Sequence, residues 1–159
     1  MVNDYIIVVD TREQKPLWTG DKVERKKLNA GDYSILGEED NMAIERKSLS
    51  DLFSTLGMGH KRFKAELDRV KDYDYFAIVV DGNYSDVITK NYPKSYLTKM
   101  KGYMISSILF TIHMKYKIPI FFGNNRVISK RIIKELFNAY YKQKKVKEGM
   151  KWASKEKIE

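Results

Sequence analysis

The chain has 159 residues, of which 43% are hydrophobic and 32% are charged, and it contains no cysteine. This length and composition predict one domain with its own core, and the lack of cysteine excludes a disulfide framework and a thiolate zinc site. The 30 basic residues outnumber the 21 acidic ones and leave a net charge of +9, which favours an anionic partner such as nucleic acid or a membrane surface.

Four short strands are predicted in the first third of the chain. Their segments are rich in β-branched residues or alternate in polarity, and turns with Gly, Pro, Asn or Asp separate them. Strands at this spacing indicate a small antiparallel meander, and the second is so charged that we expect it at an edge. The predicted strands cover residues 5–9, 23–28, 33–36 and 42–47.

Helical periodicity begins after the fourth strand. Apolar residues in 49–56 recur at helical spacing, and Ser48 with Asp51 three residues later matches a capping box. A second helix is predicted over 60–71, with one apolar face and basic residues on the others. Residues 75–81 then form a buried strand, and a loop follows over 82–93.

Long helices dominate the second half of the chain. A helix is predicted over 94–117, and its middle is apolar nearly all round, which indicates burial on two sides. A short strand over 118–122 leads to a final helix from 126 to about 145, with a wide apolar stripe. This order of elements predicts an α/β sandwich around a mixed sheet.

The chain divides into a domain over 1–145 and a tail over 146–159. The tail is rich in lysine and poor in apolar residues, so we expect it to be disordered or to act as a mobile basic arm. The N-terminus lacks the features of a signal peptide, and the longest near-apolar run, 105–114, is too short to span a bilayer. We therefore expect an intracellular protein that does not enter a membrane.

The segment around Glu45 carries the main chemical signal. Glu45 and Lys47 lie two apart in a strand and share a face, while Arg46 points to the opposite face. A carboxylate can hold a divalent metal, and an ammonium group can stabilise a nearby anion; metal-assisted phosphodiester cleavage needs both. Asp32 before the third strand and Asp10 at the end of the first are candidates for further carboxylates.

Basic side chains nearby are candidates for phosphate contacts. Arg12 can hold a phosphate through two hydrogen bonds, and Glu13 is a candidate acid partner for a buried Arg46. The candidates on the second helix are Lys61, Arg62 and Lys64.

Each feature taken alone also has a simpler interpretation. Glu45 and Lys47 fit an ion pair on a solvated strand face, and Asp51 fits a plain helix cap. The basic helix face fits an ordinary solvated surface.

Three motifs together decide between these interpretations. The chain has Asp-x-Arg-Glu at 10–13, Gly-Asp at 31–32, and Glu-Arg-Lys-x-x-x-Asp at 45–51. In this combination it resembles the nuclease domain of the XPF family over about residues 4–141. That multi-part match favours the functional interpretation of the acids and the lysine over the simpler ones.

The resemblance implies a restriction-endonuclease-like fold, a three-layer α/β sandwich with a central mixed sheet. It implies Mg²⁺- or Mn²⁺-dependent cleavage of branched DNA (flaps, forks or junctions), as in DNA repair and recombination. It also implies pairing into a dimer through the helices over 94–117 and 126–141. The implied metal ligands are Asp32, Glu45 and Asp10, and the implied catalytic residues are Asp10, Asp32, Glu45, Lys47, Arg12, Arg46 and Asp51.

Two alternatives stay open beside a structure-selective nuclease. One is a relaxed phage-type nuclease or a nickase, and the other is a non-catalytic DNA-binding scaffold subunit, which the intact acidic motif disfavours. Family members commonly carry a helix-hairpin-helix domain after the nuclease, and no such signal follows residue 145. We expect the lysine-rich tail to replace part of that DNA grip.

Overall fold

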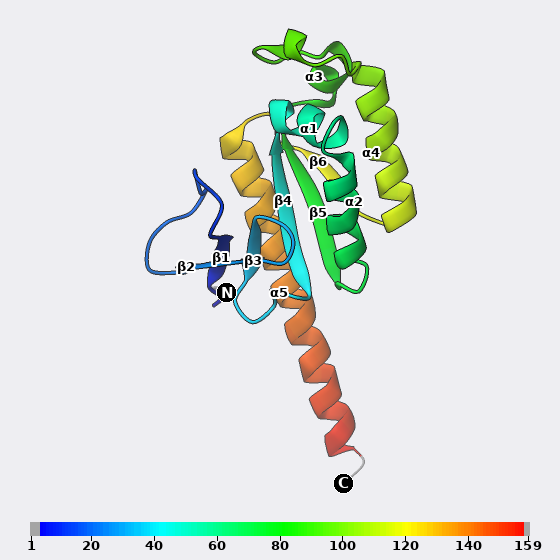
Figure 1. Ribbon diagram of the computed structural model, residues 1–159. Helices are drawn as coiled ribbons and strands as arrows, with labels where there is room; N and C mark the ends of the chain where they lie inside the picture. The colour runs from blue at the N-terminus through cyan, green and yellow to red at the C-terminus, as the bar shows by residue number, and fades with distance from the viewer. Residues whose placement is uncertain (1–3, 158–159) are drawn as a thin grey trace.

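A computed structural model describes residues 4–157 of the chain (Figure 1). It contains a six-stranded sheet in the order β2-β1-β3-β4-β5-β6. The strands are β1 (Ile7–Asp10), β2 (Val23–Lys26), β3 (Tyr33–Ile35), β4 (Met42–Ser48), β5 (Tyr75–Asp81) and β6 (Ile120–Phe122). The helices are α1 (Leu49–Leu56), α2 (His60–Arg69), α3 (Tyr84–Thr89), the 3₁₀ helix η1 (Ser95–Leu97), α4 (Gly102–Tyr116) and α5 (Arg126–Glu156).

The sheet is mixed, as the sequence predicts. Strand β3 pairs antiparallel with both β1 and β4, whereas the β1–β2, β4–β5 and β5–β6 pairs are parallel. The predicted antiparallel four-strand meander is therefore wrong for β2, which lies parallel to β1 at the outer edge and leaves β1, not β2, as the neighbour of β3. The long loop between them lets the chain return to the start of β1, and the exposed, charged β2 suits an edge.

Helices cover both faces of this sheet and create two cores (Figure 1). Helices α1, α2 and α4 pack on one face, which we call the α2 face, and α5 packs on the other, the α5 face. Strand residues alternate between the two: Ala43 belongs to the α2-face core and Ile44 to the α5-face core. The result is the predicted three-layer α/β sandwich.

The long helix predicted over 94–117 is divided in the structure. Only η1 and α4 are helical there, and α3 occupies part of the segment predicted as a loop. Gly102 explains where α4 begins, since a Cβ at this position would lie 2.2 Å from the carbonyl oxygen of Ile88. The helix start is thus fixed by close contact with α3, which periodicity alone does not reveal.

Helix α5 is longer than the sequence pattern predicts. Its first half packs through Ile133 and Phe137, which are fully buried, and Asn138 accepts a hydrogen bond from the Tyr5 hydroxyl at 2.6 Å. The helix continues past 145 to Glu156, where lysine, glutamate, methionine and alanine favour helix and no proline interrupts it. Nowhere in residues 4–157 is a helix both long and apolar enough for a bilayer.

Candidate active site

Strand register brings three aspartate and glutamate side chains into one row. Val9 pairs with Tyr33, and Tyr33 pairs with Ile44. Continuing this register by one residue places Asp32 between Asp10 and Glu45, and the Asp10 N–H donates to the Asp32 carbonyl at 2.9 Å. Opposed residues of antiparallel strands share a face, so all three point to the α2 face.

Gly31 permits the close approach that sets Asp32 in this row. Its φ of +78° is one that side-chain-bearing residues rarely adopt, and a Cβ there would lie 2.9 Å from that of Ala43. The carboxylate of Asp32 then accepts the Arg46 N–H at 2.8 Å, and the Asp32 N–H donates to the Ile44 carbonyl at 2.8 Å. The Gly-Asp motif is therefore held by the backbone of β4.

Glu45 and Lys47 form an ion pair beside Asp32. Their Oε1 and Nζ atoms are 2.9 Å apart, and only 7% of the Glu45 side chain and 18% of the Lys47 side chain are exposed. Burial lowers the pKa of Lys47, but the negative charges of Glu45, Asp32 and Glu66 together outweigh this and raise it. Lys47 is therefore a stable ammonium group suited to donate hydrogen bonds.

Two of the three carboxylates in the row, Asp32 and Glu45, are destabilised in their charged form, mainly by burial. Burial raises the pKa of Asp32 to about 7, although the Arg46 N–H works in the opposite direction. Burial also raises the pKa of Glu45 well above its usual value, and the charges of Asp32 and Glu66 add to the effect. A cation bound between these groups would relieve both effects.

Glu66 on α2 is a further acid at the site, one that the sequence analysis did not select. Its Oε1 accepts the Gly31 N–H at 2.8 Å, so α2 holds the turn that carries Asp32. The sequence contains a signal for it. Glu66 lies three residues after Phe63 and directly before Leu67, which places an acid on the buried face of an amphipathic helix.

Asp10 lies in the same row, but both of its oxygens already have partners. One accepts the Arg12 Nε–H at 2.8 Å, and the other accepts the Leu28 N–H at 2.9 Å. Arg12 also donates to the Leu28 carbonyl at 3.0 Å, while 64% of its side chain stays exposed. Arg12 is thus available to a phosphate, whereas a metal-ligand role for Asp10 remains a prediction.

Arg46 points away from the row, to the α5 face, as strand alternation predicts. Its guanidinium forms a two-point ion pair with Asp81, including an Nε–Oδ1 contact of 3.2 Å. The predicted partner, Glu13, is wrong. In the parallel β4–β5 register Arg46 pairs with Val79 and Ser48 with Asp81, so Asp81 lies two residues away on the same face.

The remaining predicted residues lie at the edge of the site. Asp51 is exposed in the first turn of α1, where its N–H donates to the capping Ser48 Oγ at 3.1 Å. Lys61 and Arg62 line a groove of about 530 Å³ together with Lys47 and Glu66. Lys64 is exposed on the same helix. A basic rim thus borders the buried carboxylates.

The donor set fits a hard divalent cation with few protein ligands. Within the described residues, no group of three or more His, Cys, Asp or Glu side chains is arranged to hold a metal ion. Mg²⁺ commonly uses only one or two protein carboxylates and completes its shell with water and substrate phosphate. Asp32 and Glu45 meet that requirement, and burial raises the pKa of both carboxyl groups although Lys47 lies beside them.

Comparison with known proteins gives a family and a fold. A family model described as the ERCC4 domain matches residues 9–136. Two solved structures, "XPF from Aeropyrum pernix" and the same protein in complex with DNA, match with TM-scores of 0.64 and 0.66, each at 22% identity. They cover 84% and 88% of this chain, which spans 60% and 66% of theirs. No curated protein matches the sequence.

These matches agree with the topology described above. The mixed six-stranded sheet between two helical layers is the α/β fold of the XPF nuclease structures, which is restriction-endonuclease-like. The matched residues include the whole row of Asp10, Asp32 and Glu45, together with Lys47 and Glu66.

Proposed function

Because the chain belongs to the ERCC4 domain family, we propose that it is a metal-dependent endonuclease that cuts branched duplex DNA. Membership of this family of nucleases supports a hydrolytic DNA endonuclease, and an XPF protein with the same fold has been solved in complex with DNA. The observation that carries the proposal is the pair of buried carboxylates, Asp32 and Glu45, next to Lys47. Lys47 in turn lines a groove with a basic rim.

Asp32 and Glu45 would hold Mg²⁺ or Mn²⁺. When bound, such an ion supplies an activated water and neutralises the charge that develops on the phosphate. The Lys47 ammonium stays protonated beside Glu45, so its role is to donate hydrogen bonds to phosphate oxygens rather than to accept a proton. Glu66 keeps the Gly31–Asp32 turn in place, and Arg12, Lys61 and Arg62 bind neighbouring phosphates.

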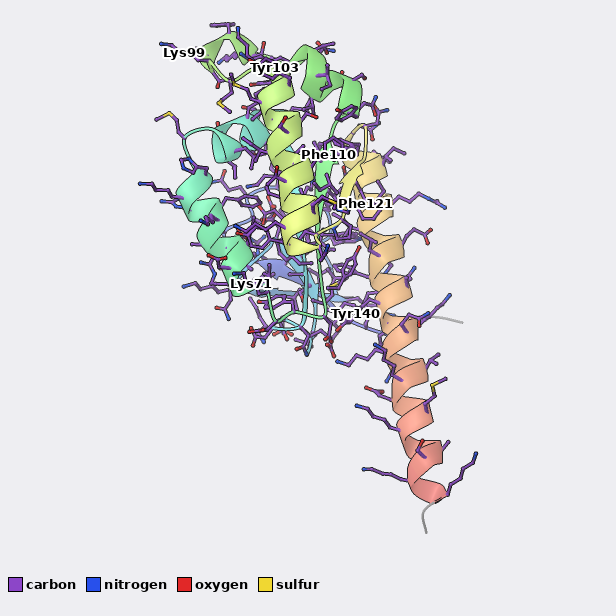
Figure 2. The ribbon with its side chains drawn as sticks, turned by 90° about the vertical axis from the view of Figure 1, so that its right-hand side faces the viewer. Lys71, Lys99, Tyr103, Phe110, Phe121 and Tyr140 are labelled. Atoms are coloured by element: carbon purple, nitrogen blue, oxygen red, sulfur yellow. The ribbon has the colours of Figure 1, made fainter. Side chains whose placement is uncertain are left out.

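We further propose that two copies pair through α4 and the start of α5. Helix α4 carries apolar side chains that the rest of the chain does not cover: Tyr103 is 65% exposed, Phe110 56% and Met114 65%. Figure 2 shows Tyr103 and Phe110 along the uncovered side of α4. Val127 at the start of α5 is 74% exposed. An uncovered apolar surface of this kind marks an interaction site.

Light scattering tests the pairing directly. We expect a dimer for the natural chain and a monomer for Phe110→Lys combined with Met114→Glu, because these changes place charge in the apolar surface. A monomeric natural chain would refute the proposal.

A cleavage panel tests the activity. Labelled flap, fork, four-way junction, duplex and single strand are each incubated with Mg²⁺, Mn²⁺ or EDTA. We expect metal-dependent cutting of one class of branched DNA, and no cutting by Asp32→Asn. Metal-dependent cutting of every substrate would indicate a relaxed nuclease instead, and a folded natural chain that cuts nothing would indicate a scaffold.

A further inference from the structure

We propose that one face of the projecting half of α5 binds the phosphate backbone of a duplex arm beside the cleavage site. The face consists of Lys144, Lys147, Lys151 and Lys155, and we call it the lysine stripe. This inference rests on the proposed function, since it names a second DNA contact of the same nuclease.

Helical spacing gathers the stripe on one side of α5. Its members follow one another at intervals of three, four and four residues, which places them along a single face. Lys144, Lys147 and Lys151 all line a groove of about 630 Å³, which two acids, Asp74 and Glu148, also line. The stripe therefore forms one surface that begins where the helix leaves the body.

The helix is anchored at that point and then projects (Figure 1). The Tyr140 hydroxyl donates to Glu38 at 3.0 Å and to Asp74 at 3.3 Å, and Lys144 forms an ion pair with Glu38. Figure 2 shows Tyr140 at the place where α5 leaves the rest of the molecule. From Lys144 to the end of α5 the helix extends by about 18 Å, and its backbone holds the lysines in one row. Such preorganisation lowers the entropy lost on binding.

Most charge on the stripe is not neutralised by the protein. Residues 142–159 hold seven lysines and three glutamates, and so carry +4 of the total net charge of +9. Within residues 4–157, the ion pairs of this segment involve Lys144 with Glu38 and Lys145 with Glu148, and none involves Lys147, Lys151 or Lys155. Free ammonium groups of this kind release counterions when they bind DNA phosphates.

The opposite side of the helix differs in character. Val146 and Met150 lie there and are 51% and 65% exposed. Four of the seven lysines of this segment share the stripe, and the other three, Lys142, Lys145 and Lys157, lie on the remaining sides of the helix. The polyanion that fits such a face, on a nuclease of this family, is duplex DNA.

Two triple variants test the stripe at equal net charge. The first is Lys147→Gln, Lys151→Gln and Lys155→Gln. The control is Lys142→Gln, Lys145→Gln and Lys157→Gln, which removes the same charge from other positions of this segment. Glutamine favours helix about as well as lysine, and circular dichroism checks that the helix is kept.

The measurement is the affinity for a long-armed branched duplex in EDTA at several salt concentrations. Each lost phosphate contact lowers the log–log slope by about 0.9, so we expect a fall of about 2.7 for the stripe variant and less than about 1 for the control. Equal falls in the two variants, or no fall in the stripe variant, would overturn the proposal. So would a loss of binding in Val146→Ser with Met150→Ser that matches the stripe variant.

Cleavage with metal separates this proposal from the one above. We expect the stripe variant to cut a short-armed substrate at the natural rate, because that substrate does not reach the stripe, and a long-armed one more slowly at low enzyme concentration. If the natural chain cuts nothing but its binding slope depends on the stripe, the nuclease proposal fails and the stripe stands. If it cuts and the slopes are equal, only the stripe fails.

Discussion

Glu45 and Arg46 are neighbours in β4, yet their side chains lie on opposite faces of the sheet, and only the charge of Arg46 is balanced by a single partner. On the α5 face, Arg46 meets the carboxylate of Asp81 through two contacts, and the pair neutralises itself. On the α2 face, the charges of Asp32 and Glu66 act on Glu45, and Glu45 forms an ion pair with Lys47. The first arrangement balances one charge with another, whereas in the second three acids lie around one lysine.

The difference separates structural charge from functional charge. The Arg46–Asp81 ion pair joins β4 to β5, and neither of its charges needs a further partner. Buried carboxylates with raised pKa values cost folding free energy, which proteins tolerate mainly where the charge binds or transforms a ligand. The four predictions below test this distinction, from the largest expected effect to the smallest.

Replacing Glu45 by Gln should abolish metal-dependent cleavage. The change removes a metal-ligand charge, which is worth several kilocalories per mole in the transition state, or more than about 1,000-fold in rate. Single-turnover cleavage of the preferred branched substrate measures it. DNA binding in EDTA serves as the control and should stay within about threefold of the natural chain. Cutting at the natural rate would place the metal site elsewhere.

Replacing Arg46 by Met should lower stability by about 2–3 kcal/mol, because it leaves Asp81 largely buried without its partner. Urea unfolding without metal measures the change. The double variant Arg46→Met with Asp81→Leu should recover most of the loss, since both charges are then gone. If Arg46→Met keeps its stability but loses cleavage, then Arg46 is catalytic, as the family resemblance implies, and the contrast between the faces fails.

Replacing Glu66 by Ala should slow cleavage about tenfold, a loss of about 1.4 kcal/mol, because the Gly31 N–H loses its acceptor and the Asp32 turn loosens. Glu66→Gln keeps an acceptor oxygen and should recover most of the rate. The apparent metal affinity should weaken in the Ala variant and be largely restored in the Gln variant. Equal defects in both variants would mean that the charge, and not the hydrogen bond, is what matters.

Replacing Asp32 by Asn should stabilise the metal-free protein at alkaline pH. The pKa of Asp32 is about 7 in the folded chain, against about 3.9 when unfolded. The stability that its protonation provides is therefore complete below about pH 4 and is lost as pH rises through 7. The Asn variant cannot ionise, so at pH 8 it should melt about 2–4 °C higher, for a gain of about 1 kcal/mol.

Thermal melts at pH 8 and pH 4 test the sign of this effect. The difference between the variant and the natural chain should disappear at pH 4, and Mg²⁺ at pH 8 should raise the melting temperature of the natural chain only. A variant that is less stable than the natural chain at pH 8 would mean that ionised Asp32 does not destabilise the fold.

Local patterns in the sequence predict much of this site. The features that depend on contacts between distant parts of the chain could not be predicted. Strand alternation is local, so it places Glu45 and Lys47 on one face and Arg46 on the other. The three-part motif predicts the family and fold that the comparisons confirm. The partner of Arg46 depends on the register between β4 and β5, 35 residues apart, which no local pattern encodes.

The same limit explains the missed acid and the misplaced elements. Glu66 reaches Gly31 across 35 residues, through the packing of α2 on the sheet. The start of α4 depends on a contact between Gly102 and α3, and the parallel pairing of β2 depends on where a long loop returns. In each case the deciding contact joins residues that are too far apart in the sequence for a periodic pattern to reveal it.

The packing of α5 also has a consequence for how the chain is made. The row of Asp10, Asp32 and Glu45, with Lys47 and Glu66, is encoded within the first 66 residues. Its sheet, however, stays uncovered on one face until Phe137 and Asn138 have been synthesised, and the Tyr5–Asn138 hydrogen bond joins residues 133 apart. Contacts of such high sequence separation form late and slow folding. A nascent chain therefore holds every candidate catalytic residue long before it can hold them in place.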